Sequence, residues 1–366
     1  MRNQVEDPLR SRIKLVALAG ALLLVLAACG GDDDDPGTTV AAGDGTTAAP
    51  AGGLVCQVTD VGGVDDRGFN QNSWEGAQRA AEEFGGEAKV LESQAETDYE
   101  VNINSFIDEG CDLIVTVGFL LGAATETAAT ANPDRKFAIV DFAYEAPTDN
   151  LKGLVFDTDQ AAFLAGYLAA GMSETGTVGT FGGINIPPVT IFMDGFAKGV
   201  AHYNEAKGTA VEVLGWDLET QDGSFTGNFE SLDDGRAFAQ SLVDEGADIV
   251  MPVAGPVGLG SAALATELGT FRVIGVDTDQ FESDPNNSAV YLTSVLKELD
   301  DAVFAAADLA LNGTFDSELY VGTLENGGVS IAPFHDHDGD VPQELKDELA
   351  ALTDAIIAGE IASLEG

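Results

Sequence analysis

The sequence predicts an α/β protein of two similar Rossmann-like lobes, each with a parallel sheet, joined by a hinge. The chain has 366 residues, which is enough for two domains of ordinary size. From residue 54 onward, short apolar segments alternate with amphipathic segments of helical length, a pattern typical of parallel sheets with helical crossovers. The second half also repeats motifs of the first half in the same order, which favours two lobes of one architecture.

The elements of the first half follow from the spacing of apolar residues. Short apolar runs predict strands, and apolar residues that recur every three or four positions predict helices. Strands that alternate with such helices imply right-handed crossovers. The expected strands are Leu54–Asp60, Lys89–Glu92, Leu113–Val117 and Phe137–Asp141, and the expected helices are Gln71–Phe84, Tyr99–Asp108 and Leu121–Ala131.

The second half matches the first in three segments. Two of the matches share an offset of 136 residues, and this offset also places Asp141 on Asp277. Because the matches keep their order, two similar α/β lobes are the simplest explanation. The matching pairs are Ser105–Ile114 with Ser241–Val250, Phe137–Val140 with Val273–Val276, and Gly62-Gly63 and Glu75-Gly76 with Gly182-Gly183 and Asp194-Gly195.

The pattern divides the chain into four parts. Residues 1–28 are expected to form a lipoprotein signal peptide, and residues 29–53 a flexible tether rich in acidic residues, Gly, Thr and Ala. Residues 54–157 with about 279–310 are expected to form the N-terminal lobe, and residues 158–278 with about 311–366 the C-terminal lobe. The expected crossovers between the lobes lie near Phe156–Gln160, near Asp277–Gln280 and after Lys297.

The N-terminus is typical of an exported lipoprotein. Arg10, Arg12 and Lys14 lie at the start of an apolar stretch that is short for a membrane span. The segment Leu26-Ala27-Ala28-Cys29 then matches the lipobox that lipoprotein signal peptidase cleaves. We therefore expect Cys29 to carry a lipid such as palmitate and to hold the protein on the extracytoplasmic face of the cell membrane. An ordinary signal peptide that happens to end in Cys is the alternative.

The chain is strongly acidic. It has 62 Asp and Glu residues against 16 Lys and Arg residues, for a net charge of −46. Removal of residues 1–28 takes away four basic and two acidic side chains, which lowers the net charge to −48. Such a polyanion repels nucleic acids, so a nucleic-acid partner is not expected. We attribute the acidity to solubility, or to a saline habitat whose salt screens self-repulsion, and not to an activity.

Several polar residues are expected at the carboxyl ends of strands. Asp60 ends the first strand, and the loop that follows contains Phe69 and Asn70, which suit a flat polar ligand. The alternative for Phe69 is a structural role, in which its ring packs in the core beneath the loop. Asp141 and Asp277 end equivalent strands, and ligands of parallel α/β lobes collect at these ends. Both carboxylates should therefore face a cleft between the lobes, with a helix cap or a turn as their alternative role.

The cysteines and histidines give no sign of an enzyme. Cys56 and Cys111 start strands that should be neighbours, so a disulfide and two buried free thiols both remain open. The run His335-Asp-His-Asp-Gly-Asp340 has the residue types of a divalent-cation site, but its spacing fits no EF-hand loop and favours an exposed acidic turn. No nucleophile is paired with a base, so we expect no catalytic residue and no cofactor.

Five stretches together resemble the basic membrane protein family. The members of this family are substrate-binding lipoproteins of ABC importers, similar to purine nucleoside receptor A. The resemblance covers nearly the whole chain after residue 54 and implies a periplasmic-binding-protein type I fold that closes around its ligand by hinge motion. The stretches that carry it are Thr59-Asp60 through Asp65-Asp66-Arg-Gly-Phe69-Asn70-Gln71, Trp74-Glu-Gly76, Val253-Ala-Gly255, Val273-Ile-Gly-Val-Asp277-Thr-Asp279-Gln280 and Leu292-Thr-Ser-Val-Leu-Lys297.

The resemblance implies a set of ligand-binding residues. A purine would lie between the rings of Phe69 and Phe229, and Phe229 is assigned through its spacing to Gly235. The connection 216–228 is longer than the family's usual one, so Phe225 and Phe192 are the alternatives to Phe229. Asp60, Asn70 and Asp141 would contact the base or its surroundings, and Gly255, Asp277 and Lys297 would line the ribose side. A surface lysine is the alternative for Lys297.

The expected function is therefore that of a monomeric solute-binding lipoprotein. It would capture a purine nucleoside in the cleft between the lobes and deliver it to the permease of an ABC importer. One alternative keeps the fold and changes the ligand to a sugar or other polyol. The other is a surface lipoprotein that adheres to a host or matrix macromolecule and makes little use of the cleft.

Overall fold

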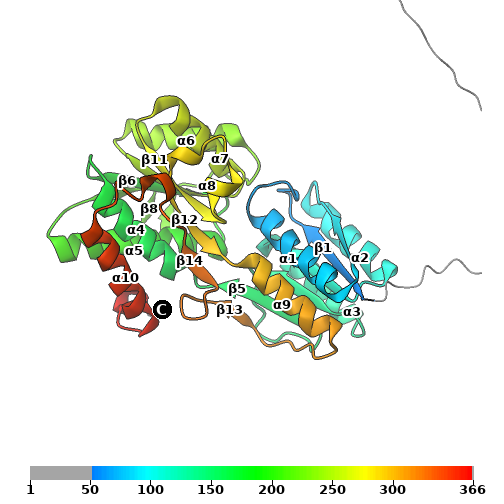
Figure 1. Cartoon of the computed structure of the whole chain (residues 1–366). Coiled ribbons are helices and arrows are strands. Elements are labelled where there is room, and N and C mark those ends of the chain that lie inside the picture. The colour runs from blue at the N-terminus through cyan, green and yellow to red at the C-terminus, as the bar shows by residue number, and fades with distance from the viewer. Residues whose placement is uncertain (1–51, 365–366) are drawn as a thin grey trace, which may run out of the picture. The chain divides into compact units, whose positions relative to one another are not determined.

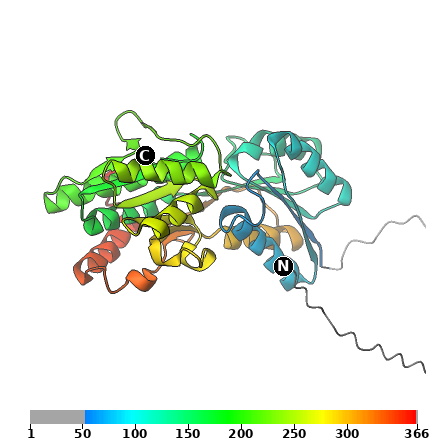
Figure 2. The same cartoon turned by 90° about the horizontal axis from the view of Figure 1, so that it is seen from above.

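The computed structural model describes residues 52–364, which contain two six-stranded sheets (Figure 1). The expected signal peptide, Cys29 and all but the last two residues of the expected tether lie outside the described residues. Figure 2 shows the two sheets with their helices as two lobes, side by side. The predicted α/β architecture of two lobes with mainly parallel sheets is confirmed. Within residues 52–364, no helix is both long and apolar enough to cross a membrane.

The first lobe contains a parallel sheet in the order β13-β5-β4-β3-β1-β2. Both faces of this sheet are buried, because α1 and α9 pack on one face and α2 and α3 on the other. The strands are β1 (Leu54–Thr59), β2 (Glu87–Leu91), β3 (Leu113–Val117), β4 (Phe137–Val140), β5 (Leu151–Phe156) and β13 (Tyr320–Gly322). The helices are α1 (Phe69–Phe84), α2 (Tyr99–Glu109), α3 (Gly122–Ala131) and α9 (Leu299–Leu311), with 3-10 turns η1 (Glu96–Asp98) and η2 (Phe119–Leu121).

The second lobe contains a sheet in the order β14-β12-β11-β10-β6-β7, in which only β14 is antiparallel to its neighbour. A separate hairpin, β8 (Trp216–Asp217) with β9 (Asp222–Gly223), follows β7. The other strands are β6 (Thr177–Gly182), β7 (Glu212–Leu214), β10 (Ile249–Val253), β11 (Arg272–Asp277), β12 (Tyr291–Lys297) and β14 (Val329–Ile331). The helices are α4 (Thr158–Met172), α5 (Pro187–Lys207), α6 (Leu232–Asp244), α7 (Val257–Leu268), α8 (Gln280–Ser283) and α10 (Gln343–Ile357), with 3-10 turns η3 (Ser288–Val290), η4 (His335–His337) and η5 (Ala362–Leu364).

Alternation along the strands explains why both faces of each sheet are covered. In β1, Val55 belongs to the cluster beneath α1 and α9, whereas Cys56 and Val58 belong to the cluster beneath α2 and α3. Successive side chains of a strand point to opposite faces, so an unbroken apolar strand needs helices on both sides. The carboxyl ends of the strands are then the free edge where loops collect.

The chain crosses between the lobes three times, after β5, after β12 and between β13 and β14. The first two crossovers lie where the sequence predicts them. The predicted crossover near Asp277–Gln280 is wrong, because the chain returns there through α8 into β12 of the same sheet. The third crossover instead lies between β13 and β14. The predicted lobe boundaries change accordingly: residues 279–297 belong to the second lobe, whereas α9 and β13 belong to the first.

The two main crossovers have matching geometry. Asp157 precedes α4 with ψ 65°, and Glu298 precedes α9 with ψ 65°. The backbone N–H of Asp157 donates to the carbonyl of Gly322 at 2.8 Å, and that of Glu298 donates to the carbonyl of Gly328 at 3.0 Å. Gly322 and Gly328 lie on the third connection, so this connection is hydrogen-bonded to both of the others. The hinge is thus a compact group of three crossing segments.

Gly76 and Gly195 allow close packing of the two helices that follow a crossover. Helix α9 follows a strand of the second lobe but packs in the first, and α4 follows a strand of the first lobe but packs in the second. A Cβ atom on Gly76 would lie 2.3 Å from the carbonyl oxygen of Asp300, and one on Gly195 would lie 2.5 Å from the Cα of Asp159. The missing side chain lets α1 approach α9, and lets α5 approach α4. The repeat of Glu75-Gly76 as Asp194-Gly195 therefore marks equivalent helix contacts.

A disulfide joins Cys56 and Cys111, whose Cα atoms are 6.1 Å apart. Both cysteines are fully buried, in the cluster beneath α2 and α3. Cys56 lies in β1, and Cys111 lies just before β3, which pairs with β1. The structure therefore contains the bonded form of the two alternatives that the sequence leaves open.

Candidate functional site

The loop between β1 and α1 is held by a buried carboxylate. Oδ1 of Asp66 accepts the backbone N–H groups of Gly68 and Gln71, each at 3.0 Å, and Oδ2 accepts that of Asn70 at 2.8 Å. These groups belong to the start of α1, where backbone N–H groups have no partner within the helix. Burial raises the pKa of Asp66 to about 6, although these hydrogen bonds oppose the shift. The loop is thereby fixed next to the end of β1.

Asn70 has one side-chain acceptor without a partner in the described part of the protein. Its Nδ2 donates to Oδ1 of Asp60 at 2.8 Å and to Oδ2 of Asp66 at 3.2 Å. Its Oδ1 is buried and has no hydrogen-bond partner in the described part of the protein. A buried acceptor without a partner costs free energy, so a ligand that donates to it there gains affinity.

Asp141, Asp277 and Lys297 form a charged group at the ends of β4, β11 and β12. Nζ of Lys297 lies 2.7 Å from Oδ2 of Asp141 and 3.5 Å from Oδ1 of Asp277. The lysine side chain is 3% exposed, so it is not the surface lysine of the alternative interpretation. Asp141 comes from the first lobe and the other two from the second, so one ammonium connects carboxylates of both lobes.

Burial sets the protonation of this group. Burial raises the pKa of Asp277 to about 6, and the nearby ammonium of Lys297 opposes the shift. Burial alone would lower the pKa of Lys297, but Asp141 and Asp277 raise it above its ordinary value. The lysine is therefore a fixed cation, and burial raises the pKa of Asp141 as well as that of Asp277.

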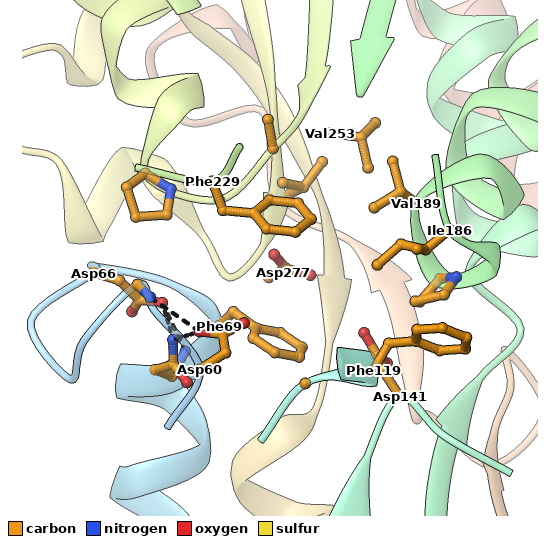
Figure 3. Close-up of a pocket in the computed structure, with 18 of the residues that line it drawn as sticks. Asp60, Asp66, Phe69, Phe119, Asp141, Ile186, Val189, Phe229, Val253 and Asp277 are labelled. Atoms are coloured by element: carbon orange, nitrogen blue, oxygen red, sulfur yellow. Dashed lines mark hydrogen bonds between the residues drawn. The ribbon is translucent and has the colours of Figure 1, made fainter. Parts of the chain in front are cut away.

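Aromatic rings from both lobes approach this group. Figure 3 shows Phe69 and Phe229 on opposite sides of one space, with Asp277 behind them. Phe69 begins α1 in the first lobe, and Phe229 lies between β9 and α6 in the second. Nζ of Lys297 lies 5.1 Å from the centre of the Phe69 ring and 5.2 Å from that of Phe192. Two such rings suit a flat ligand, because aromatic faces attract one another when they are stacked in parallel with a lateral offset.

The long connection after β7 places Phe229. After the hairpin of β8 and β9, the chain runs beside the end of β6, where Thr226 N–H donates to the carbonyl of Gly182 at 3.0 Å. Gly227 N–H donates to the carbonyl of Gly183 at 2.7 Å. The ring of Phe229 then packs on Gly183, where a Cβ atom would lie 2.3 Å from the ring. The extra length therefore forms an added edge segment that carries Phe229 to the cleft.

All eight residues predicted from the sequence line one pocket of about 610 Å³, a volume that includes space open to solvent. They are Asp60, Phe69, Asn70, Asp141, Phe229, Gly255, Asp277 and Lys297. Of the two alternatives to Phe229, Phe192 lines the same pocket and Phe225 does not. The ligand-binding roles of these residues stay predictions.

Other lining residues have no sequence signal that separates them from core residues. They include an apolar group at the side of the pocket where Figure 3 shows Phe119, Ile186 and Val189. Asp66 lies within a stretch that carries the family resemblance, but it is not among the predicted site residues. The further lining residues are Gly62, Asp66, Gly118, Phe119, Leu120, Ile186, Pro188, Val189, Phe192, Val253, Ala254, Pro256 and Val276.

The lining is rich in acceptors and poor in donors. Four carboxyl groups face one ammonium, and that ammonium is already paired with Asp141 and Asp277. An anionic ligand would meet like charge in a buried space, which is unfavourable. A neutral ligand with several hydroxyl or N–H donors fits this lining best.

The run His335–Asp340 does not form a metal site. Nε2 of His335 lies 2.7 Å from Oδ2 of Asp279, and Nδ1 of His337 lies 3.2 Å from Oδ2 of Asp340. Among residues 52–364, no group of three or more His, Cys, Asp or Glu side chains is arranged to hold a metal ion. These histidines instead connect the turn to α8 and to neighbouring backbone.

Comparison with known proteins agrees with this architecture. The family described as "ABC transporter substrate-binding protein PnrA-like" (Bmp) matches residues 54–363. The "ABC transporter nucleoside-binding protein BmpA" of Lactococcus lactis is 32% identical over 83% of this chain and 87% of its own length. "Basic membrane protein A" of Borreliella burgdorferi is 33% identical over 82% of this chain and 84% of its own length.

A solved structure has the same fold over most of its length. The ABC transporter system solute-binding protein from Aeropyrum pernix matches with a TM-score of 0.76 and 27% identity, over 84% of this chain and 92% of that chain. The family match spans both lobes and the hinge, and therefore includes every residue that lines the pocket. The resemblance noted in the sequence is confirmed, and the chain belongs to the PnrA-like (Bmp) family of ABC transporter substrate-binding proteins.

Proposed function

We propose that this protein captures a purine nucleoside between its lobes and delivers it to the permease of an ABC importer. The observation that carries the proposal is the combination of facing rings, Phe69 and Phe229, with the acceptor-rich group around Lys297 in one pocket. The name of the Lactococcus lactis relative, a nucleoside-binding protein, supports the same ligand class. In this role the protein binds and releases its ligand without chemistry.

The rings suit the base of a nucleoside. Stacking on both faces of a purine removes a large apolar surface from water, and each aromatic contact adds about 1 kcal/mol beyond that burial. The free Oδ1 of Asn70 lies in the same lining and accepts from an N–H group at the edge of the base. Phe69 and Asn70 are adjacent in α1, so one helix start supplies both interactions.

The charged group suits the sugar. Ionised carboxylates form strong hydrogen bonds with hydroxyl donors, and Asp141 and Asp277 each keep acceptor capacity beyond their pairing with Lys297. Lys297 favours the ionised form of both carboxylates, whose pKa values burial raises, and fixes their positions. A free purine base would use the rings and Asn70 but not the charged group, and a free sugar would use the charged group alone.

We further propose that lipid on Cys29 holds the protein at the extracytoplasmic face of the membrane. The lipobox in the sequence supports this anchor, and the family's role in ABC transport supports a membrane partner. Mass spectrometry of the membrane-extracted chain tests the anchor directly. An N-terminal diacylglyceryl-modified cysteine is expected, and an unmodified chain that begins upstream of Cys29 contradicts the anchor.

The ligand is tested by mass spectrometry of small molecules released from the purified protein, followed by titration calorimetry with inosine, guanosine and adenosine. We expect at least one nucleoside to bind at micromolar concentration or below. Ribose and free purine bases serve as half-ligand controls and should bind far more weakly. Binding of ribose as strong as that of the nucleosides would favour a sugar receptor, and silence toward all nucleosides at tens of micromolar would discard the assignment.

A further inference from the structure

An ion pair joins the two lobes outside the pocket. Nη1 of Arg67 lies 3.0 Å from Oδ1 of Asp284. Arg67 precedes α1 in the first lobe, and Asp284 follows α8 in the second. Neither residue lines the pocket that we assign to the nucleoside. The pair therefore connects the lobes without touching the ligand space.

The carboxylate of this pair is fixed within the second lobe. Asp284 has a side chain only 1% exposed, and its Oδ2 accepts from Nδ2 of Asn287 at 2.7 Å and from the hydroxyl of Tyr291 at 3.2 Å. Its Oδ1 faces the first lobe and accepts from Arg67. A buried carboxylate with one oxygen directed at another lobe needs a cation there, because an unpaired buried charge is costly.

The arginine is presented by the loop that forms one wall of the pocket. Arg67 has φ 58°, a left-handed backbone that side chains other than Gly seldom adopt. Its neighbour Asp66 points inward and binds the start of α1, whereas Arg67 points to Asp284. One strained turn thus places a pocket residue and an interlobe cation back to back. At the same seam, Nδ2 of Asn72 donates to the carbonyl of Lys297 at 3.3 Å.

We propose that Arg67 and Asp284 form a latch that holds the lobes closed, with Arg67 as a positioning residue for ligand retention. A hinge motion that moves Arg67 away from Asp284 breaks the pair, so the pair stabilises the closed state over the open one. A contact present only in the closed complex slows dissociation of the ligand and leaves association nearly unchanged. The nucleoside identity rests on the proposed function, whereas the latch itself does not.

The test compares Arg67→Gln with Arg79→Gln. Arg79 is a matched control, because its side chain is 42% exposed against 44% for Arg67 and it also pairs with carboxylates, Asp300 and Asp301. Those partners lie on α9 of the same lobe, so the Arg79 pair does not respond to hinge opening. Stopped-flow measurement of inosine release should show roughly tenfold faster dissociation for Arg67→Gln and no change for Arg79→Gln.

Salt gives a second signature of the latch. Because Arg67 is half-exposed, added NaCl screens the pair, and the dissociation rate of the wild type should approach that of Arg67→Gln. The variant itself should respond to salt much less. Equal dissociation rates for the wild type and Arg67→Gln at low salt would overturn the latch.

Hydrogen exchange tests the latch whatever the ligand is. In the full-length protein as purified, Arg67→Gln should raise amide exchange in peptides over 61–68 and 284–291, and Arg79→Gln should not. Asp284→Asn, with its melting temperature measured, should reproduce the effect from the other side of the pair. Unchanged exchange in these peptides contradicts the latch, whereas a wild type that binds no nucleoside contradicts only the proposed ligand.

Discussion

Asp141 and Asp277 end equivalent strands of the two lobes and share the same left-handed backbone, with φ 66° and φ 69°. Such a conformation is uncommon for a residue other than Gly and is retained where the surroundings enforce it. Here both carboxylates are turned toward one ammonium, that of Lys297. The equivalent strand ends of the two lobes therefore form a paired acceptor site in the gap between them.

Asp277→Asn should weaken nucleoside binding at neutral pH by roughly tenfold to a hundredfold, because an ionised acceptor of a sugar hydroxyl is lost. Titration calorimetry with inosine measures the loss. Asp65→Asn is the control, because Asp65 is exposed and does not line the pocket. Equal affinities of Asp277→Asn and the wild type would remove Asp277 from the site.

The affinity of the wild type should fall as the pH is lowered through about 6. The pKa of Asp277 is raised to about 6 by burial, and Asp141 and Asp66 add to the shift while Lys297 opposes it. Below pH 6 the protonated carboxyl group no longer accepts as an anion, so binding weakens by up to tenfold per pH unit. Asp277→Asn should lose this part of the pH dependence.

The free energy of unfolding of the ligand-free protein should rise as the pH is lowered, whereas the ligand affinity falls. Because the pKa of Asp277 is about 6 in the folded state and near 3.8 in the unfolded state, the folded state binds more protons between these values. This group therefore makes unfolding easier as the pH rises from about 4 to about 6. Urea unfolding of the wild type and Asp277→Asn across this range isolates its contribution, and parallel curves would contradict the raised pKa.

Phe229→Leu should lower nucleoside affinity by roughly tenfold to a hundredfold, because it keeps an apolar side chain but removes one stacking face. Phe229→Tyr keeps the ring and should bind nearly as well as the wild type. Fluorescence or calorimetric titration of both variants makes the comparison. Wild-type affinity in Phe229→Leu would assign the second wall to another ring, such as Phe192.

Gly183→Ala should also lower nucleoside affinity, because it displaces the ring of Phe229. The new methyl group would lie 2.3 Å from the present ring position of Phe229, so the ring must move. Gly339→Ala is the control, because a Cβ atom there meets nothing within 4 Å. We expect roughly tenfold weaker binding for Gly183→Ala alone, and unchanged affinity would show that Phe229 needs no support from Gly183.

Removal of the disulfide with Cys56→Ala and Cys111→Ala should lower the free energy of unfolding by about 3 kcal/mol, because the bond closes a loop of 55 residues. Nucleoside affinity should stay nearly unchanged, since neither cysteine lines the pocket. Denaturant unfolding with and without reductant provides the measurement. Two reactive thiols in the unfolded, unreduced wild type would contradict the bond.

Residues at strand ends could be predicted from the sequence because their position follows from topology. Asp60, Asp141 and Asp277 each follow a run of apolar residues, and parallel strands bring such positions to one edge of a sheet. The repeat adds that the edges of two sheets face each other. These features depend on the pattern of apolar residues and on the repeat, which is why they are visible without coordinates.

Other features depend on packing and could not be predicted. Phe119 and Ile186 line the pocket, but an apolar residue in a loop has the same signature as a core residue. The sequence predicts a crossover near Asp277–Gln280 because a strand ends there. In the structure the chain returns through α8 to its own sheet, and α8 is too short to be recognised from the sequence. The pair of Arg67 and Asp284 joins residues 217 positions apart, for which no local pattern exists.

The most direct test of the central claim compares inosine with inosine 5′-monophosphate by titration calorimetry under identical conditions. The pocket holds four carboxyl groups and one lysine that is already paired, so a neutral nucleoside should bind and its phosphorylated form should bind at least a hundredfold more weakly. Comparable binding of the two, or stronger binding of the nucleotide, would contradict an acceptor-rich site built for a neutral, hydroxyl-bearing ligand.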